Sequence, residues 1–458
     1  MSIAIINPAT GETEKEFEAH DAAEVERRLA LADAAYRTMR GTTFAQRAEW
    51  MNRAADLLDA ELEDTAVMMV HEMGKPIAAA RAEVAKCAKG ARFYAAHSEA
   101  FLADEPLDDP SSVNASKAYA RFQPLGAVLA VMPWNYPLWQ VMRFAAPALM
   151  AGNAGVLKHA SNVPGSAMYL DGLFTRAGFP EGAFVTLLIG SREVKDVIED
   201  PRIKAVTLTG SEPAGRSVAS TAAAQVKKAV LELGGSDPFI VMPSADLDGA
   251  VKTAVTARTQ NNGQSCIAGK RFIVHADVYD AFTEKFVAAM AALKMGDPLD
   301  EATQVGPVAT ASGRDELAEL VDDARAKGAE ILTGGVQPDG PGWFYPPTVV
   351  AAVTPAMRLH LEEAFGPVAT LYKVADAAEA IAIANGTSFG LSSAAWTNDA
   401  AEQELFSNEL EAGGVFLNGM TISYPELPFG GIKNSGYGRE LGAPGIKEFC
   451  NMKTIWKA

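Results

Sequence analysis

Cys266 is the residue whose type and surroundings point most clearly to covalent chemistry. It lies in NNGQSCIAGKRFIV, a polar, glycine-containing segment that leads into a β-rich run. A lone cysteine is commonly a small buried hydrophobe, but polar neighbours on both sides make this a poor core position. A loop at the edge of a strand is a usual place for a nucleophile. We therefore predict a nucleophilic thiol, with a buried structural cysteine as the alternative.

Two polar residues elsewhere have the properties that such a nucleophile requires. Glu232 ends the apolar run in AVLELGGSDP, where burial would raise its pKa and make it a proton acceptor near neutral pH. Asn135 lies between two prolines in VMPWNYPLWQ, so its amide is held in place and can donate to a developing oxyanion. The alternatives are a helix-capping or ion-paired glutamate and an ordinary turn asparagine.

The segment TGSEPAGRS comes close to a phosphate-binding loop. It matches the P-loop spacing except that Arg216 stands where that loop has lysine, and guanidinium does not replace a compact ammonium there. The GxGxxG fingerprint is absent. We interpret the segment as the N-terminus of a helix, whose backbone N–H groups can hold a pyrophosphate.

Composition excludes several other functions. The chain has 458 residues, 48% hydrophobic and 21% charged, and a formal net charge of −17, which opposes binding to nucleic acid or anionic membranes. Three dispersed cysteines without a CxxC spacing, together with six histidines without HExxH, predict no disulfide framework and no metal. No signal peptide and no membrane-spanning run is evident, so we expect a cytoplasmic protein with small-molecule partners.

The elements that must position these residues follow from the hydrophobic pattern. Residues 21–103 have helical periodicity, which we interpret as scaffold without chemistry. Residues 126–234 repeat a short apolar run, a turn and a helical segment, which is typical of a parallel sheet with covering helices. The runs DPFIVMP, RFIVHADVYDAFTEKFVAAMAAL and ATLYKVADAAEAIAIANG repeat this pattern and predict a second α/β lobe.

Seven segments, taken in order, resemble the aldehyde dehydrogenase superfamily across essentially the whole chain. They are PWNYPL, GNAGVLK, LTGSEPAGR, LELGG, GQSC, EEAFGPV and PFGGIKNSGYGRE. The resemblance implies an α/β fold with two Rossmann-like lobes and a small β oligomerisation element. It divides the chain into a cofactor domain (1–105 and 125–234), a catalytic domain (235–447) and the oligomerisation element (106–124 and 448–458). A homodimer or homotetramer is implied.

The resemblance also assigns roles to individual residues. Cys266 attacks an aldehyde as thiolate, Asn135 and the Cys266 N–H stabilise the oxyanion, and Glu232 activates the water that hydrolyses the thioester. The hydride acceptor is a nicotinamide dinucleotide. The positions that match its binding residues are Trp134, Lys158, Ser161, Gly210, Ser211, Glu363 and Phe365.

Two departures from the family pattern lie next to the cofactor lysine. Many NAD-preferring members have a glutamate at the position of Ser161, where a carboxylate binds ribose hydroxyls and repels a 2′-phosphate. Serine removes that repulsion, so we predict that NADP is accepted and preferred over NAD. His159 stands where proline is common, and the sequence offers no account of it.

The substrate is expected to carry a carboxylate. The segments around Asn135, Cys266 and SYPELPFGG resemble a bacterial branch that oxidises succinate semialdehyde. Arg143 is the lone charge in an apolar helix and requires a nearby carboxylate, either the substrate's or a structural one. Ser423 can bind the same carboxylate. Gln260 stands where other branches have arginine, which weakens this assignment.

Three rival functions remain at this stage. The first is a non-acylating aldehyde dehydrogenase of broader specificity. The second is a dehydrogenase that passes the thioester to coenzyme A, against which the water-activating Glu232 argues. The third is a non-catalytic binding protein, against which the presence of nucleophile, base and oxyanion donor argues.

Overall fold

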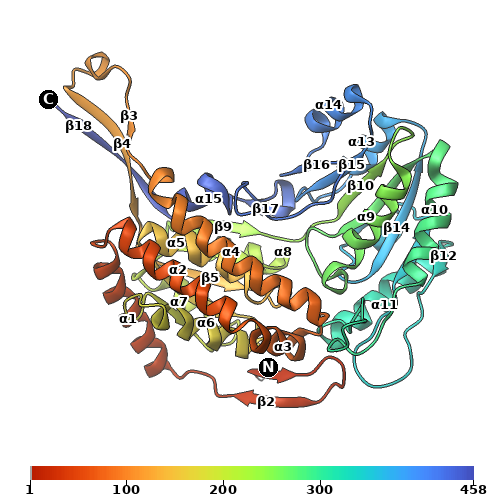
Figure 1. The fold of residues 1–458 in the computed structure, drawn as a ribbon, viewed down its shortest axis with the longest axis horizontal. Coiled ribbons are helices and arrows are strands. Elements are labelled where there is room, and N and C mark those ends of the chain that lie inside the picture. Colours follow the sequence, from red (N-terminus) through yellow and green to blue (C-terminus); the bar gives the residue numbers. More distant parts are fainter. Residues whose placement is uncertain (1–2) are drawn as a thin grey trace.

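Two α/β lobes lie side by side in the computed structural model, which describes residues 3–458 (Figure 1). Each lobe is built on its own sheet, and a narrow three-stranded sheet projects from the first lobe. This arrangement confirms the predicted fold class. Among residues 3–458, no helix combines the length and apolar character that crossing a membrane requires.

The first lobe contains a six-stranded sheet. Its strands, in spatial order, are β17 (Gly436–Tyr437), β9 (Lys228–Glu232), β8 (Ile203–Thr209), β5 (Ala127–Met132), β6 (Ala154–His159) and β7 (Phe184–Thr186). All pairs are parallel except β17 with β9. The strand order reverses at β5, so the carboxyl ends of β5 and β8 form the switch point where open sheets of this type bind ligands.

Helices cover both faces of this sheet. The first-lobe helices are α1 (Ala22–Met39), α2 (Phe44–Ala60), α3 (Leu62–Met73), α4 (Ile77–Phe101), α5 (Trp139–Ala151), α6 (Pro164–Arg176), α7 (Val194–Glu199), α8 (Glu212–Ala224) and α15 (Gly442–Lys447). Helices α1, α7 and α8 pack on one face, while α2, α4, α5 and α6 pack on the other. Every residue of α5 is buried, because this helix lies between the sheet and α4.

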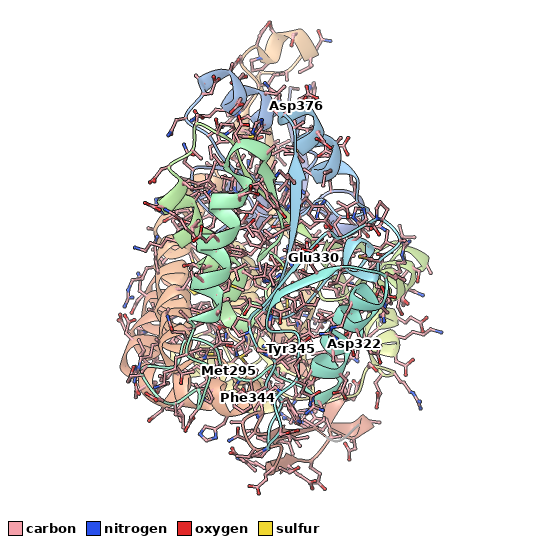
Figure 2. All side chains as sticks on the ribbon, turned by 90° about the vertical axis from the view of Figure 1, so that its right-hand side faces the viewer. Met295, Asp322, Glu330, Phe344, Tyr345 and Asp376 are labelled. Atoms are coloured by element: carbon pink, nitrogen blue, oxygen red, sulfur yellow. The ribbon has the colours of Figure 1, made fainter. Side chains whose placement is uncertain are left out.

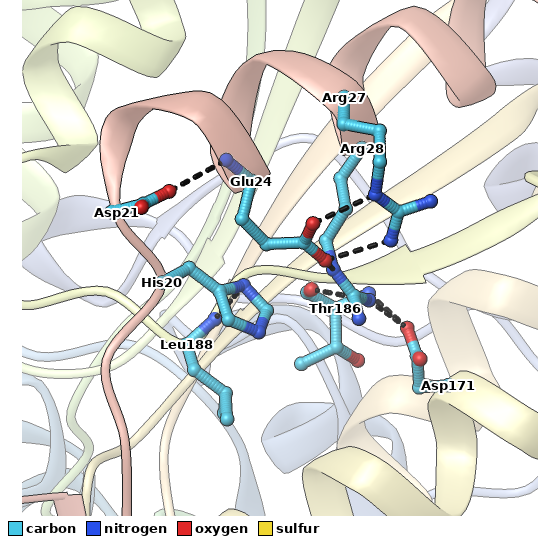
Figure 3. A network of polar contacts seen from close by, with 8 residues as sticks. All are labelled: His20, Asp21, Glu24, Arg27, Arg28, Asp171, Thr186 and Leu188. Carbon is cyan, nitrogen blue, oxygen red and sulfur yellow. Dashed lines mark hydrogen bonds and ion pairs between the residues drawn. The ribbon is translucent and has the colours of Figure 1, made fainter.

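A polar network fastens α1 to the rest of the first lobe (Figure 3). The guanidinium of Arg28 donates to Glu24 at 2.7 Å, to Asp171 at 2.8 Å and to the Thr186 carbonyl at 3.0 Å. These contacts connect α1 with α6 and β7. Arg27 joins the same network, but its guanidinium donates only to Glu24.

The second lobe contains a seven-stranded sheet. Its strands, in spatial order, are β12 (Glu330–Thr333), β13 (Thr348–Ala351), β14 (Val368–Val374), β11 (Gly269–His275), β10 (Asp237–Val241), β15 (Ser393–Trp396) and β16 (Val415–Leu417). Its helices are α9 (Leu247–Thr259), α10 (Ala276–Ala291), α11 (Ala311–Ala326), α12 (Arg358–Leu361), α13 (Ala377–Asn385) and α14 (Ala400–Glu409). Figure 2 looks onto this lobe, with Glu330 of β12 near the centre of the view and Asp376, which caps α13, near the top.

Two smaller sheets and three 3-10 turns complete the fold. An N-terminal hairpin pairs β1 (Ile3–Ile6) with β2 (Thr13–Phe17), and the projecting sheet has the order β18 (Cys450–Lys457), β4 (Lys117–Pro124), β3 (Glu105–Pro106). The 3-10 turns are η1 (Pro110–Val113), η2 (Gln260–Gly263) and η3 (Lys433–Ser435). The projecting sheet thus contains the two segments in which the resemblance placed a separate β element.

One predicted domain boundary differs from the structure. Residues 235–447 were assigned to a single catalytic domain, but β17 pairs with β9 of the first lobe, with Gly436 opposite Glu232. Helix α15 also packs against α4 and α5. The chain therefore returns to the first lobe before residue 447, through a strand of two residues that is too short to produce a hydrophobic pattern.

Candidate active site

The Cys266 loop connects α9 to β11 and has an unusual backbone. Asn261, Asn262 and Gly263 adopt left-handed conformations with φ of 55°, 58° and 74°. A side chain at Gly263 would place its Cβ 2.4 Å from the Gly366 carbonyl carbon, so only glycine fits there. The side-chain amide of Asn262 donates to the carbonyls of Gly74 and Pro307 at 2.8 and 2.9 Å, which fastens the loop to its surroundings.

Lys270 holds the nucleophile's own backbone. Its buried amino group donates to the carbonyls of Ser265 and Cys266 at 2.9 and 2.8 Å and pairs with Glu363 at 3.0 Å. The Ser265 carbonyl also accepts from the Ala268 N–H at 3.1 Å, so the lysine adds a second donor to it and supplies one to the Cys266 carbonyl. The position of the Cys266 thiol is thereby fixed from the strand that follows it.

Asn135 lies against this loop, as its predicted role requires. Its side-chain amide donates to the Gln264 carbonyl at 3.1 Å, two residues before Cys266. The Asn135 carbonyl accepts from the side-chain amide of Asn261 at 2.7 Å and from the Lys75 amino group at 3.1 Å. An amide nitrogen carries two N–H groups, so one N–H of Asn135 remains available to another acceptor.

A buried ion pair supports the Asn135 segment from behind. Lys75 pairs with Glu83, and the Glu83 carboxylate accepts from the backbone N–H groups of Leu138 and Trp139 at 2.9 Å each. These N–H groups belong to the start of α5 and have no partner within the helix. Helix α4 and the link that precedes it therefore hold the Asn135 segment in place, although they contribute none of the predicted catalytic residues.

Cys266 is half-buried and lines a cavity of about 240 Å³ between the two lobes. The other residues that line it are Ala79, Ala82, Glu83, Lys86, Tyr136, Trp139, Gln140, Arg143, Gln260, Asn261, Ser265, Ile267, Thr421, Ile422, Ser423 and Phe429. All three predicted substrate residues, Arg143, Gln260 and Ser423, are among them. The structure thus brings the nucleophile and the predicted substrate residues to one cavity.

Glu232 and Cys266 are linked electrostatically through Arg143. The guanidinium of Arg143 forms a buried ion pair with Glu440, donates to the Thr209 hydroxyl at 3.2 Å and interacts with the charges of Glu232 and Cys266. Burial raises the pKa of Glu232 well above its ordinary value, and the Glu440 carboxylate raises it further. No hydrogen bond to the Glu232 carboxylate is found in residues 3–458, so its oxygens are free to bind a water.

The surroundings of Cys266 favour the protonated form of its thiol. Burial raises the pKa of Cys266 to about 12, although the positive charges of Arg143 and Lys270 oppose this effect. Attack on a carbonyl therefore requires removal of the thiol proton when substrate binds. Such a site keeps the thiol unreactive until a proton acceptor and an oxyanion donor act together.

The carboxylate that pairs with Arg143 belongs to the protein itself. The sequence left open whether Arg143 meets a substrate carboxylate or a protein one, and Glu440 of the GYGRE segment is its partner. Arg143 also stacks its guanidinium over Phe429 at 4.8 Å. Its charge is therefore compensated before any substrate binds.

Two residues of the cavity went unnoticed in the sequence because the helices of residues 21–103 were interpreted as scaffold. That interpretation is wrong for α4, which places Glu83 and Lys86 on the cavity wall. Their spacing of three positions places both on one helix face, but the sequence does not show that this face borders a cavity. Glu440 was likewise missed because it lies in a glycine-rich loop.

The turn that is predicted to hold the pyrophosphate lies at the switch point of the first-lobe sheet. Gly210 and Ser211 connect β8 to α8, and Ser211 is the N-cap of that helix, which confirms the predicted helix N-terminus. Next to this turn is a groove of about 350 Å³ lined by Glu212, Arg216, Ala219, Leu231, Leu233, Lys433, Asn434, Gly436 and Tyr437. An N-terminus beside a partly apolar groove suits a pyrophosphate and an adenine ring.

Lys158 lies on strand β6, next to β5 in the sheet, and Ser161 lies in the turn after β6. Lys158 is half-buried, and burial lowers its pKa. Its amino group makes no hydrogen bond or ion pair within residues 3–458, so a cation is held here without a protein anion. Ser161 anchors its turn by accepting a backbone hydrogen bond from Ala4 at 3.1 Å. The residues present therefore fit an anionic or hydroxyl-rich nucleotide group.

The other three predicted cofactor residues are drawn together from the two lobes. Trp134 packs edge-on against Phe365, with ring centroids 5.7 Å apart. Glu363 is oriented by Lys270 and lies close to Gly234, where a Cβ would meet its carboxylate at 2.4 Å. This places Glu363 between the Glu232 strand and the Cys266 loop.

His159 has a structural explanation that the sequence did not provide. One ring nitrogen, Nε2, donates to the Pro137 carbonyl at 2.8 Å, and Nδ1 accepts from the Ala160 N–H at 2.9 Å. The second contact requires a neutral imidazole, and the first then places the ring proton on Nε2. Burial lowers the pKa of His159 to about 4. The imidazole thus joins the cofactor strand to the Asn135 segment.

The fold and this site define a cysteine-dependent dehydrogenase, and the chain belongs to the aldehyde dehydrogenase family, whose sequence profile matches residues 1–455. It is 65% identical to a succinate-semialdehyde dehydrogenase [NADP(+)] of Mycolicibacterium paratuberculosis, covering 100% of this chain and 97% of the relative. It is 62% identical to succinate-semialdehyde dehydrogenase [NADP(+)] 1 of Mycobacterium tuberculosis, with both chains covered completely. The succinic semialdehyde dehydrogenase structure from Streptococcus pyogenes with NADP+ superposes with a TM-score of 0.96 at 37% identity, covering 99% of each chain.

Proposed function

We propose that this enzyme oxidises succinate semialdehyde to succinate with NADP as the preferred hydride acceptor. The observation that carries the proposal is the cavity that Cys266 lines together with the cationic side chains of Arg143 and Lys86, next to the loop that the Asn135 amide contacts. A small cavity with a nucleophile and positive charge suits a short aldehyde that carries a carboxylate. The names of the relatives that are 62% to 65% identical to this chain support the same substrate and cofactor.

The bonds and protons of this reaction balance as follows. The Cys266 sulfur bonds to the aldehyde carbon as its thiol proton passes to solvent water, and the amide of Asn135 stabilises the resulting oxyanion. A dinucleotide held at this site would accept the hydride that the thiohemiacetal carbon loses, and Cys266 would then carry the thioester. Glu232 takes a proton from the attacking water, and this proton passes to the sulfur as the thioester C–S bond breaks, which releases the carboxylic acid and restores both the thiol and the Glu232 carboxylate.

The groups that would hold the dinucleotide are the ones found at the switch point. The backbone around Gly210 and Ser211 would hold the pyrophosphate, Lys158 and Ser161 the adenosine ribose with its 2′-phosphate, and Glu363 the nicotinamide ribose. Trp134 and Phe365 would enclose the nicotinamide end.

A comparison of four aldehyde and cofactor combinations tests the proposal. Purified enzyme is assayed with succinate semialdehyde or butanal, each with NADP or NAD. We expect the highest kcat/KM for succinate semialdehyde with NADP. Equal kcat/KM for the two aldehydes would favour an aldehyde dehydrogenase of broad specificity instead. Formation of an acyl-CoA when coenzyme A is added would favour the acylating alternative.

Ser161 provides a separate test of cofactor preference. In a Ser161→Glu variant, a carboxylate would repel the 2′-phosphate and bind ribose hydroxyls, so the ratio of kcat/KM for NADP to that for NAD should fall at least tenfold. Steady-state kinetics with saturating aldehyde measure this ratio. A wild-type enzyme for which NAD exceeds NADP more than tenfold would refute the predicted preference.

A further inference from the structure

Three consecutive carbonyl groups of the Cys266 loop accept hydrogen bonds from side chains. The Gln264 carbonyl accepts from two asparagine amides at 3.1 and 3.0 Å. The Ser265 and Cys266 carbonyls both accept from the amino group of Lys270, at 2.9 and 2.8 Å. The orientation of the peptide groups around the nucleophile therefore depends on these side chains as well as on the turn itself.

The peptide group between Ser265 and Cys266 connects Lys270 to a predicted oxyanion donor. Its carbonyl belongs to Ser265 and its N–H to Cys266, and in a planar trans peptide the two point in opposite directions. The carbonyl accepts from Lys270 and from the Ala268 N–H, which occupies both of its lone pairs. No acceptor for the Cys266 N–H is found in residues 3–458. This N–H is therefore free to donate on the side opposite to Lys270.

A positive charge at the carbonyl end of a peptide strengthens the donor at its other end. Hydrogen bonds in a chain polarise one another by about 10 to 30% for each bond, and the effect is electrostatic. The Lys270 ammonium is almost completely buried, so water screens its charge little. Its contact with the Ser265 carbonyl should therefore both fix the Cys266 N–H in direction and make it a better donor.

Acidic side chains of the second lobe hold the Lys270 ammonium in this position. Its nitrogen lies 3.0 Å from a carboxylate oxygen of Glu363, and its charge also interacts with that of buried Asp237. A Cβ at Gly235 would lie 2.8 Å from the Cys266 carbonyl oxygen, so the glycine lets this carbonyl approach. The buried cation is thus compensated by protein groups and directed at the loop.

The other cation near the nucleophile is placed differently. The charges that act on the Cys266 sulfur come from Arg143 and Lys270, which are positive, and from Glu363 and Asp237, which are negative. Arg143 pairs with the carboxylate of the GYGRE segment and donates to a threonine hydroxyl, and it contacts no carbonyl of the Cys266 loop. Among residues 3–458, Lys270 is the cation that contacts the peptide of the nucleophile.

We infer that Lys270 is a positioning residue for the oxyanion site, because it orients and polarises the peptide whose N–H belongs to Cys266. This inference rests on the proposed reaction at Cys266, but not on the identity of the aldehyde. The thiohemiacetal and the tetrahedral intermediate of thioester hydrolysis both place an oxyanion next to this N–H. Lys270 therefore acts on both steps.

A Lys270→Met variant tests the inference by kinetics. Loss of a whole oxyanion donor costs about 100- to 1,000-fold in kcat in other enzymes, and Lys270 acts only through one donor, so kcat should fall about tenfold. The decrease should be the same for succinate semialdehyde and butanal, because both form the same oxyanion. With saturating NADP, KM for each aldehyde should change less than about threefold.

A ketone that cannot transfer a hydride gives a second readout. In trifluoromethyl ethyl ketone, the Cys266 sulfur would bond to the carbonyl carbon while the thiol proton passes to the ketone oxygen. The resulting hydroxyl group can then ionise to an oxyanion. Fluorine NMR of the adduct over a pH series measures the acid dissociation constant of this hydroxyl. We expect the constant to be about tenfold smaller in Lys270→Met than in wild type, since the anion loses stabilisation.

Arg271→Met is the matched control. Arg271 is the next residue on β11 and equally buried, but its guanidinium donates to carbonyls outside the Cys266 loop. Its loss should destabilise the fold but leave the acid dissociation constant of the adduct within about twofold of wild type. Lys270→Arg keeps a charged donor and should stay within about threefold.

The outcomes separate this inference from the proposed function. If Lys270→Met leaves the acid dissociation constant unchanged, or if Arg271→Met lowers it equally, Lys270 does not act on the oxyanion and the inference is wrong. A wild-type enzyme that forms no adduct with the ketone would contradict the attack of Cys266 on a carbonyl, and with it both proposals. Should Lys270→Met fail to fold, Lys270→Gln replaces it under the same criteria.

Discussion

At the residue scale, the site depends on a cysteine whose environment keeps it protonated. Desolvation dominates the pKa of the Cys266 thiol, and two nearby cations only partly offset it. The same low-polarity surroundings raise the pKa of Glu232. Both groups gain reactivity as they lose protons, so the free enzyme should become more reactive with increasing pH.

The first prediction concerns alkylation of this thiol. Because only the thiolate reacts, the rate constant for iodoacetamide modification of Cys266 should rise close to tenfold per pH unit from pH 7 to pH 10. Mass spectrometry of the Cys266 peptide measures the rate, with N-acetylcysteine as the solvent-exposed reference. A plateau at or below pH 8 would mean that the thiolate is already formed in the free enzyme.

The chemistry of the site was largely predictable from residue type and local sequence. Cys266, Glu232 and Asn135 are reactive or polar residues, and the packing of a hydrophobic core does not explain their presence in these segments. Lys86 and Glu440 were not predictable in this way. Each contacts a residue that is distant in sequence: Lys86 donates to Ser423, and Glu440 pairs with Arg143. Hydrophobic periodicity does not predict such contacts.

At the element scale, the parallel strands that are buried on both faces were the elements that the sequence pattern predicted most clearly. The runs that became β5, β6, β8 and β9 were predicted because central strands consist of nearly continuous apolar residues. Short edge strands such as β17 were missed, because two residues pair through backbone groups alone. The interpretation of α4 as scaffold alone was wrong for a different reason. A helix that packs against its own lobe can also line a cavity.

His159 leads to a prediction about pH and stability. Its pKa is about 4 in the folded protein, below its ordinary value of 6.5, so the unfolded state binds the proton more tightly between these values. The stabilisation from neutral His159 is therefore present above pH 6.5 and is lost as the pH falls toward 4. The free energy of unfolding should decrease by about 3 kcal/mol at most over this range.

The variant His159→Gln tests this dependence. At pH 8 it should have a lower melting temperature than wild type, because the hydrogen bond to Pro137 is disturbed. The difference should shrink or reverse at pH 4.5, where wild type carries the cost of protonating His159. Differential scanning fluorimetry at several pH values measures it, with exposed His97→Gln as control. A difference independent of pH would refute the prediction.

The attachment of α1 to the first lobe provides a test at the same scale. Replacing Arg28 with Met removes its contacts with Glu24, Asp171 and the Thr186 carbonyl, and should destabilise the protein by about 2 kcal/mol. Arg27→Met is the control, since Arg27 is exposed and pairs only with Glu24, and should change stability by less than about 0.5 kcal/mol. Thermal unfolding curves that coincide for the two variants would show that this network does not hold α1 in place.

At the scale of the whole molecule, the projecting sheet is the feature that a single chain does not account for. β18 is an edge strand of eight residues, and Met452 and Trp456 on it are 64% and 50% exposed. A long edge with exposed apolar side chains is a pairing surface that proteins normally cover. We propose that another copy of the chain covers it in a homodimer or homotetramer.

Met452→Glu should therefore weaken assembly without unfolding the lobes. Met452 and Trp456 lie four residues apart on one face of β18, so a charge at 452 would be buried against the neighbouring copy at a cost of several kcal/mol. Light scattering after size exclusion should show a lower mass than wild type at micromolar concentration, with circular dichroism unchanged. Lys453→Glu, on the opposite face of the strand, is the control for charge alone. If Met452→Glu keeps the wild-type mass, or if wild type is itself monomeric, the exposed face of β18 is not the assembly surface.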